Sequence, residues 1–292
     1  MKIINLGSIN IDHVYRVEHF VRPGETIKSE RYSVFSGGKG ANQSLSLARA
    51  GAKVFHAGKI GQDGIWLKEK LHLDGVDTGL VETVDVPSGH ALIQVDKEGE
   101  NAIIIHAGAN ETFTDADIDN VLDSARQGDY LLLQNEINGI EQILEKAKDL
   151  CVVFNPAPMT DGVKDYPLKH VDIFIINEVE GKALTGEEDF HTILATMQKL
   201  YPSSKTVLTL GEKGLIYSDD HQKIEVPGLK VNALDTTGAG DTFTGYFLAE
   251  LLRGSEIKKC LEMGVRASAL CVTREGAGDS IPKRDEVMDY GL

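Results

Sequence analysis

The sequence predicts an α/β fold with a largely parallel central sheet and a small antiparallel sheet that projects from it. Two observations predict this fold. Short apolar segments rich in β-branched residues alternate with longer segments of helical periodicity, which is typical of β-α-β units with right-handed crossovers. Two stretches, residues 11–35 and 88–106, break this alternation with strand-like segments that have little helix between them.

The strands expected in the main sheet have continuous apolar character, which indicates strands covered on both faces. They are expected at Ile3–Leu6, Val54–Ala57, Tyr130–Leu133, Val152–Phe154, Ile173–Ile176 and Thr206–Leu210. The helices between them are expected at Gly40–Arg49, from Thr114 to Ser124, and at Gly139–Lys148, Asp241–Leu252 and Ser255–Cys271. Gly51 is a typical helix stop. Thr114 and Asp117 have the spacing of a capping box.

The projecting sheet is expected from a hairpin pattern. Ala91–Val95 and Ala102–His106 flank the turn-prone segment 96–101, which predicts a β-hairpin. Such a sheet must cover one face with a ligand or another subunit, since its edges are otherwise open. No repeat, low-complexity tract or linker divides the sequence, so we expect one continuous domain, residues 1–292, with a β appendage.

The composition restricts the class of partner. Thirty Lys and Arg against 45 Asp and Glu give a net charge of −15, which repels nucleic acid and anionic lipid. No apolar run approaches the roughly 18–20 residues that span a bilayer, and the first residues turn polar too early for a signal peptide. The three cysteines, Cys151, Cys260 and Cys271, lack CxxC spacing and indicate buried thiols in a reducing compartment. We therefore expect a soluble cytoplasmic protein that binds neither nucleic acid nor membranes.

The strongest motif is the glycine-rich segment Asp235–Gly245, which leads into a helical pattern. Gly238 and Gly240 remove side-chain bulk, so backbone N–H groups at the helix start can approach an anion closely. A carboxylate at Asp241 would be costly in an anion site unless it has a task. It can accept the proton of a hydroxyl group that attacks phosphorus. The alternative is that Asp241 only caps the helix, since Asp is a favoured N-cap residue.

A second glycine-rich motif lies at Gly37–Asn42. It lacks the spacing of a Walker phosphate loop, and a glycine follows Lys39 where Ser or Thr would be required. A turn that exposes backbone donors, Lys39 and Asn42 could instead bind the hydroxyl groups of a polyol. The alternative is an ordinary glycine turn that enters a helix.

Together these two motifs resemble the two signatures of the ribokinase (PfkB-type) carbohydrate kinases. Other family elements follow in order and with family-like spacing. They are the opening Gly7–Asp12, the N-x-x-E element Asn177–Glu180, the nucleotide loop Thr209–Gly214 and the cation loop Val272–Ser280. The resemblance covers essentially the whole chain. It implies a three-layer α/β/α sandwich with a β-sheet lid, formed by roughly residues 11–35 and 88–106, and ATP-dependent phosphorylation of a sugar hydroxyl.

The resemblance also implies the role of each matching residue. Asp241 would be the base that deprotonates the acceptor hydroxyl, and the N–H groups of Gly238, Ala239 and Gly240 would stabilise the transferring phosphoryl group. The sugar would be bound by Asn10, Asp12, Gly38, Lys39 and Asn42, with Glu136 closing the pocket. These side chains and backbone groups can each donate or accept hydrogen bonds, which suits vicinal diols.

Nucleotide and ions are assigned in the same way. ATP would be bound by Asn177, Thr209, Gly211, Gly214 and Gly240. Glu180 would act on Mg²⁺ through water, because Mg²⁺ keeps much of its hydration shell. A potassium ion would be bound, mostly by backbone oxygens, at Asp235, Thr237, Cys271, Arg274, Gly276 and Ser280. Taken alone, Asn177 and Glu180 are more typical of a helix cap and a solvated helix acid than of a nucleotide site.

The resemblance implies ribose as the acceptor, phosphorylated on its terminal hydroxyl. One residue departs from the pattern: Ile11 stands where ribokinases typically carry alanine, and a larger side chain beside Asp12 would change the pocket. A kinase of another sugar, a sugar acid or a nucleoside, and a non-catalytic sugar-binding protein, are the alternatives. A nicotinamide oxidoreductase is disfavoured, since no G-x-G-x-x-G follows the first strand. The exposed lid edges predict a homodimer.

Overall fold

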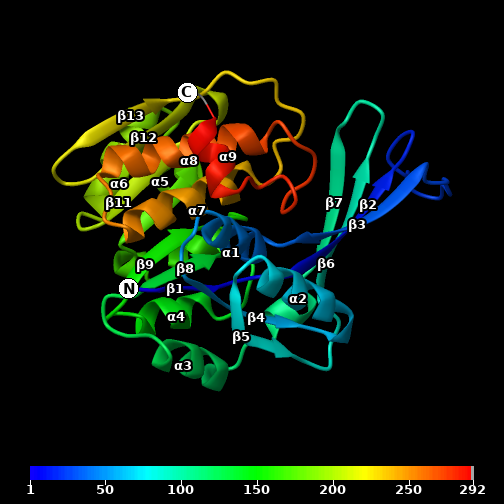
Figure 1. The fold of residues 1–292 in the computed structure, drawn as a ribbon, viewed down its shortest axis with the longest axis horizontal. Helices are drawn as coiled ribbons and strands as arrows, with labels where there is room; N and C mark the ends of the chain where they lie inside the picture. Colours follow the sequence, from blue (N-terminus) through cyan, green and yellow to red (C-terminus); the bar gives the residue numbers. More distant parts are fainter. Residues whose placement is uncertain (291–292) are drawn as a thin grey trace.

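The computed structural model describes residues 1–290 and contains a nine-stranded and a four-stranded sheet (Figure 1). The large sheet has the strand order β13-β12-β11-β10-β9-β8-β1-β4-β5. Its strands are β1 (Ile3–Leu6), β4 (Val54–Ile60), β5 (Asp77–Thr83), β8 (Tyr130–Gln134), β9 (Cys151–Asn155), β10 (Ile173–Asn177), β11 (Lys205–Thr209), β12 (Gly214–Ser218) and β13 (Lys223–Pro227). From β5 to β11 the strands run parallel, and β12 and β13 close one edge as antiparallel strands.

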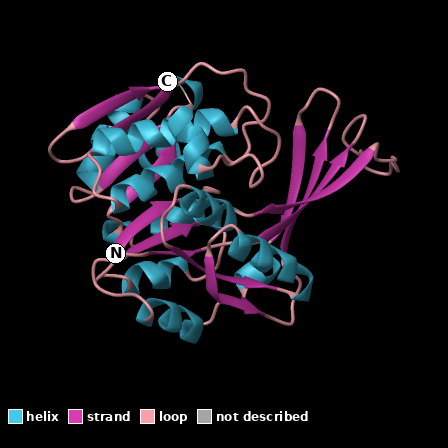
Figure 2. Ribbon diagram, viewed as in Figure 1, coloured by secondary structure: helices cyan, strands magenta, loops and turns pink. Residues whose placement is uncertain are grey.

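Helices cover both faces of the large sheet, as Figure 2 shows. They are α1 (Lys39–Arg49), α2 (Ile65–Leu73), α3 (Asp115–Asp123), α4 (Ile140–Lys146), α5 (Glu178–Thr185), α6 (Phe190–Leu200), α7 (Ala239–Leu252), α8 (Ile257–Cys271) and α9 (Arg284–Asp289). Adjacent strand residues point to opposite faces. Leu132 therefore packs in the core with α1, α7 and α8, while Leu131 and Leu133 pack in a second core with α3 to α6. The three-layer α/β/α arrangement expected from the sequence is confirmed.

The small sheet projects from one side of the sandwich (Figure 1). Its strands, in the order β3-β2-β6-β7, are β2 (Asn10–Arg16), β3 (Arg31–Gly37), β6 (Gly89–Val95) and β7 (Asn101–His106). The hairpin expected over residues 91–106 is confirmed as the antiparallel pair β6–β7. The expectation of a wholly antiparallel sheet was wrong, because β2 and β6 pair in parallel. They do so because each continues from a strand of the large sheet, β1 and β5, and those strands run in the same direction.

The strands and helices that were expected occur with ends shifted by no more than three residues. The largest shift is at β4, which ends at Ile60 rather than at Ala57, and α7 begins at Ala239 rather than at Asp241. The capping box of Thr114 with Asp117 is present, and Gly51 has the positive φ of 83° that suits a residue just after a helix. Within residues 1–290 the structure contains no helix with the length and apolarity required to cross a membrane.

Candidate active site

Asp241 lies in the first turn of α7, close to the end of the helix where backbone N–H groups lack partners. The N-cap residue of α7 is Gly238, with a φ of 77° and a ψ of 0°, so the alternative that Asp241 caps the helix was wrong. A Cβ atom on Gly238 would also lie 3.1 Å from the carbonyl oxygen of Ala277. The turn therefore requires glycine, and it leaves the carboxylate of Asp241 free for another task.

Two amides from α1 hold this carboxylate. The Nδ2 of Asn42 donates to Oδ2 of Asp241 at 3.2 Å, and the Nε2 of Gln43 donates to Oδ1 at 2.9 Å. The two glycine-rich motifs thus meet at Asp241. Gln43 was not identified from the sequence, although it directly follows Asn42 and contacts the same carboxylate.

Burial raises the pKa of the Asp241 carboxyl. Lys39 and the two amide donors act in the opposite direction, and the charge of Glu136 adds to the increase. Such a carboxylate has a higher proton affinity than one in water, which suits a group that takes a proton from a hydroxyl.

Lys39 is the cation of this site. Burial alone would lower the pKa of its amine, but the carboxylates of Asp241, Glu136, Glu180 and Asp12 together raise it. Lys39 therefore stays charged and balances the negative charge that these residues bring together. This charged cluster therefore contains the residue predicted to be the base, residues predicted to bind the sugar and the residue predicted to act on Mg²⁺.

Asp12 and Asn10 enter the site from β2. Burial, with a contribution from Glu136 that Lys39 partly offsets, raises the pKa of Asp12 to about 7. The carboxyl group packs so closely on Gly37 that a Cβ atom there would lie 2.1 Å from Oδ2. The Oδ1 of Asn10 accepts a hydrogen bond of 2.7 Å from Asn110.

Ile11 does not share the environment of Asp12. It is 5% exposed and belongs to the hydrophobic core, on the opposite face of β2 from Asp12 because adjacent strand residues alternate. The larger side chain therefore fills the core rather than the space beside Asp12.

Glu136 connects the loop after β1 to the start of α1. Its Oε2 accepts hydrogen bonds from the Ser8 hydroxyl at 2.5 Å and from the backbone N–H of Lys39 at 2.9 Å. Between these points Gly38 has a φ of 87°, and a Cβ atom there would lie 3.0 Å from the nitrogen of Asn10. Ser8 was not identified from the sequence. Glu136 thus lies where the small sheet joins the sandwich, and it holds the Gly38 turn in place.

Asn177 and Glu180 form a reciprocal capping box at the start of α5. Glu180 donates its N–H to Oδ1 of Asn177 at 2.9 Å, and its carboxylate accepts from the N–H and Nδ2 of Asn177 at 2.9 and 3.0 Å. The interpretation as a helix cap is therefore right. The interpretation of Glu180 as a solvated acid was wrong, since it is buried and this burial raises its pKa.

The predicted nucleotide loop lies beside this cap. Thr209 and Asn177 are register partners at the ends of β11 and β10, and the Thr209 hydroxyl donates to the carbonyl of Ile176 at 3.3 Å. Gly211 and Gly214 both have positive φ, and a Cβ atom on Gly214 would lie 2.1 Å from a backbone oxygen. The loop and the N-x-x-E element therefore lie side by side at the carboxyl ends of β10 and β11.

The segments predicted to bind potassium also come together. The Asp235 carboxylate accepts from the N–H groups of Thr237 and Gly276, both at 2.9 Å. Other side chains there already have partners: Arg274 pairs with Glu286 at 2.6 Å, and Cys271 contacts Ser280 at 3.0 Å. An ion at this place would consequently take main-chain oxygens. Within residues 1–290 no three His, Cys, Asp or Glu side chains are grouped so as to hold a metal ion.

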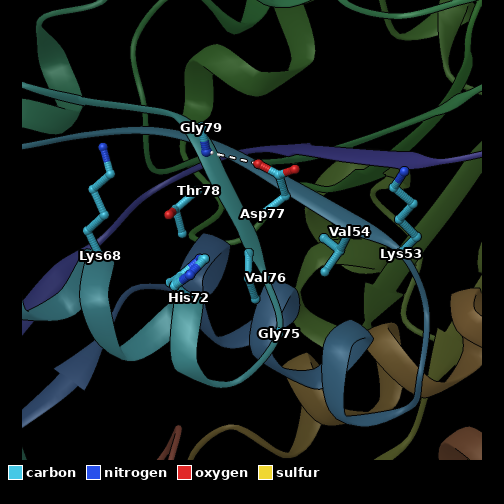
Figure 3. A pocket seen from close by; sticks show the side chains of 9 residues that line it. All are labelled: Lys53, Val54, Lys68, His72, Gly75, Val76, Asp77, Thr78 and Gly79. Atoms are coloured by element: carbon cyan, nitrogen blue, oxygen red, sulfur yellow. Dashed lines mark hydrogen bonds between the residues drawn. The ribbon is translucent and has the colours of Figure 1, made fainter.

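A separate surface hollow of about 610 Å³ lies between α2 and the strands β4 and β5 (Figure 3). It is lined by Lys53, Val54, Lys68, His72, Gly75, Val76, Asp77, Thr78 and Gly79. None of these residues belongs to the charged cluster around Lys39. This hollow is therefore distinct from the candidate active site.

The comparisons with known proteins agree with this geometry. The family model of the pfkB carbohydrate kinases matches residues 1–284, and the chain belongs to that family. It is an ATP-dependent carbohydrate kinase, a phosphotransferase of the ribokinase-like type.

Relatives that match over the full length of the chain include ribokinases and a deoxyribokinase. The chain is 38% identical to the ribokinase of Haemophilus influenzae, over 98% of this chain and 96% of that protein. It is 30% identical to the deoxyribokinase of Salmonella typhi, over 99% and 98%. Among solved structures, it resembles ribokinase from Cryptococcus neoformans in complex with ADP, with a TM-score of 0.87, 35% identity and 99% of both chains covered. It also resembles Arabidopsis thaliana ribokinase complexed with ribose and ATP, with a TM-score of 0.86, 30% identity and 98% and 97% covered.

Proposed function

We propose that this kinase transfers the γ-phosphoryl group of ATP to the terminal hydroxyl of ribose and so forms ribose 5-phosphate. The observation that carries this proposal is the buried Asp241 carboxylate, which Asn42 and Gln43 hold within the same charged cluster as Asp12 and Lys39. The full-length similarity to ribokinases supports ribose as the acceptor. The whole chain acts as one kinase domain, with the small sheet as its lid.

In the proposed reaction Asp241 takes the proton of the acceptor hydroxyl. The hydroxyl oxygen then forms a bond to the γ-phosphorus while the bond from that phosphorus to the leaving oxygen of ADP breaks. The N–H groups of Gly238, Ala239 and Gly240 stabilise the negative charge of the transferring group at the start of α7. The N–H of Ala239 also reaches the carbonyl of Thr236 at 3.3 Å, so Gly238 and Gly240 contribute the freer donors.

The sugar is bound by residues that lie between the small sheet and α1. These are Asn10, Asp12, Gly38, Lys39, Asn42 and Glu136. The Oδ1 of Asn42 is buried and has no hydrogen-bond partner within residues 1–290, so an acceptor remains for a sugar hydroxyl while Nδ2 holds Asp241.

The nucleotide is bound at the carboxyl ends of β10 and β11, by Asn177, Thr209, Gly211 and Gly214, with its γ-phosphate at Gly240. Glu180 fits Mg²⁺ binding through water, because both carboxylate oxygens already accept hydrogen bonds from Asn177 and keep further lone pairs. Mg²⁺ would neutralise phosphate charge there. A potassium ion would be held near Asp235 by main-chain oxygens of Thr237, Cys271, Arg274, Gly276 and Ser280.

Two further features belong to this proposal. The chain forms a homodimer through the small sheet, because the residues of its outer strand β7, Ile103, Ile104 and Ile105, are all more than half exposed. Such an apolar edge is typical of a surface that another chain covers. A cytoplasmic location is expected from the unpaired cysteines.

The test is ADP release with Mg-ATP and potassium across a panel of ribose, deoxyribose, other pentoses, fructose, sugar acids and nucleosides. A clear preference for ribose is expected. Preference for deoxyribose or another acceptor would contradict the proposed substrate and leave the kinase class intact. No release with any member of the panel would also contradict the proposal.

A further inference from the structure

A chain of buried amides lies behind Asp241. Gln43 donates from Nε2 to the Asp241 carboxylate at 2.9 Å, and its Oε1 accepts from the Nε2 of Gln134 at 2.7 Å. Gln134 Nε2 also donates to Oδ1 of Asn5 at 3.0 Å. Asn5, Gln43 and Gln134 are each fully buried, with 0% exposure. Water therefore does not replace these hydrogen bonds, and each amide depends on the next.

A backbone carbonyl sets the direction of this chain. The Nδ2 of Asn5 donates to the carbonyl oxygen of Gly40 at 2.7 Å. Because a carbonyl only accepts, Asn5 must turn its amino group to Gly40 and its oxygen to Gln134. Gln134 must then present Nε2 to Gln43, and Gln43 must present its oxygen in return. As a result, Gln43 faces Asp241 with its amino group.

A second backbone carbonyl fixes Gln43 from another side. The Nδ2 of Asn155 donates to the carbonyl of Ile175 at 2.9 Å, which leaves its Oδ1 as an acceptor 3.2 Å from Gln43 Nε2. Both N–H groups of Gln43 therefore have acceptors, one on Asn155 and one on Asp241. The orientation of the Gln43 amide is consequently determined at its nitrogen as well as at its oxygen.

The arrangement leaves one acceptor without a partner. Gln134 Oε1 is buried and has no hydrogen-bond partner within residues 1–290. It lies so close to Gly7 that a Cβ atom there would approach it to 2.2 Å. A buried acceptor without a partner costs stability. If the amide chain served stability alone, an orientation that leaves a buried acceptor without a partner would not be expected. The orientation of the amides therefore indicates a function at Asp241.

We propose that Gln43 is a positioning residue: it orients the carboxylate of Asp241 and favours the form of that carboxylate that accepts a proton. This inference rests on the proposed role of Asp241 as the base. Both Asp241 oxygens face an N–H donor, from Gln43 and from Asn42. An ionised carboxylate only accepts and matches both donors, whereas a protonated carboxyl would turn a proton toward one of them.

The test is Gln43→Met, which keeps the length of the side chain and removes its donors. With Mg-ATP and ribose, kcat is expected to fall by about 10- to 100-fold, the scale of a misplaced catalytic group. The dissociation constant for ribose should change less than about twofold, because the residues proposed to bind the sugar are unchanged. The acid limb of the kcat–pH profile should move to higher pH, because a donor that lowers the pKa of Asp241 is lost. The other charges that act on Asp241, those of Lys39, Glu136 and Glu180, are unchanged.

Leu47→Ala is the matched control. Leu47 lies on the same helix α1, is equally buried, and packs in the hydrophobic core with an apolar side chain that makes no hydrogen bond to the amide chain. It should lower the melting temperature and leave the acid limb in place. If Gln43→Met does not fold, Gln134→Met replaces it, with a smaller shift in the same direction expected.

The possible results distinguish a failure of the proposed role of Asp241 from a failure of the proposed role of Gln43. Asp241→Asn is measured in parallel, and wild-type turnover in that variant would contradict the role of the base itself. If Asp241→Asn is inactive while Gln43→Met keeps the wild-type kcat and acid limb, only the role of Gln43 is overturned. An acid limb that moves equally in Leu47→Ala would also overturn it. If the wild type does not phosphorylate ribose, the preferred acceptor of the panel is used instead.

Discussion

Asn42 donates a hydrogen bond of 3.2 Å to Asp241, although 199 residues separate them in the chain. The bond exists because α1 and α7 pack side by side and each begins at a glycine turn, at Gly38 and Gly238. The starts of the two helices therefore converge on one point. A sugar bound by the first motif, as we propose, would lie next to the carboxylate of the second.

Asp241→Asn should reduce turnover by roughly 10²–10⁴-fold, the usual contribution of a general base. Sugar binding should stay nearly intact, because asparagine keeps the shape of the side chain. In the wild type, turnover should fall as the pH drops through the raised pKa of Asp241, since only the unprotonated carboxylate accepts a proton. Steady-state ADP release and calorimetric titration with ribose measure the two effects. Near-wild-type turnover would remove Asp241 from this role.

Asp12→Asn should weaken sugar binding and stabilise the free protein in a pH-dependent way. The carboxyl pKa is about 7 in the folded chain against a usual 3.8, so the folded state binds the proton more tightly. Wild-type stability is therefore expected to fall as the pH rises from about 4 to 7. The variant lacks this titration. Its advantage in melting temperature should grow over that range and level off above pH 7, and a constant difference would contradict the prediction.

Potassium should raise activity relative to sodium, because the loops at Asp235 and Gly276 are tied together next to α7. An ion bound there would stabilise the glycine turn that carries the proposed anion site. ADP release is measured in potassium and in sodium chloride at equal ionic strength. Identical rates in the two salts would count against the ion site.

The homodimer should depend on the outer surface of the small sheet. Ile104 is 64% exposed and shares a cross-strand row with Leu92, which is 40% exposed. Ile104→Lys should convert a dimer into a monomer in light scattering, because a buried lysine without a partner opposes association. Leu73→Lys, at an exposed position at the end of α2, is the control and should remain dimeric. A wild-type monomer at working concentration would contradict the dimer.

Six of the nine strands of the large sheet were predicted, because they are apolar on both faces, as in Ile3–Leu6 and Tyr130–Gln134. The strands at its two ends, β5, β12 and β13, were not predicted, and β5 and β13 are partly exposed. The parallel direction of the β2–β6 pair could not be predicted, because it depends on the direction of the strands of the large sheet from which β2 and β6 continue. Local patterns do not contain that information. Asp241 and Asn42 could be found because glycines mark their turns.

Gln43, Gln134 and Asn5 could not be found in this way, since no short motif marks a chain of amides. One signal was present in the sequence. Gln134 and Asn155 each end an apolar strand, and these strands are parallel neighbours. Polar residues at the carboxyl ends of parallel strands lie where α/β proteins bind ligands. Their contact with Gln43 emerges only from the fold.

The parallel pairing of β2 with β6 has a consequence for synthesis of the protein. A ribosome releases β2 and β3 first, and β2 lies inside the small sheet with β3 on one side and β6 on the other. Until residues 89–95 have emerged, the second edge of β2 has no strand to pair with. Open edges of this kind recruit other chains. The nascent hairpin is thus the segment most exposed to misassociation, and the time taken to translate residues 38–88 sets the length of that exposure.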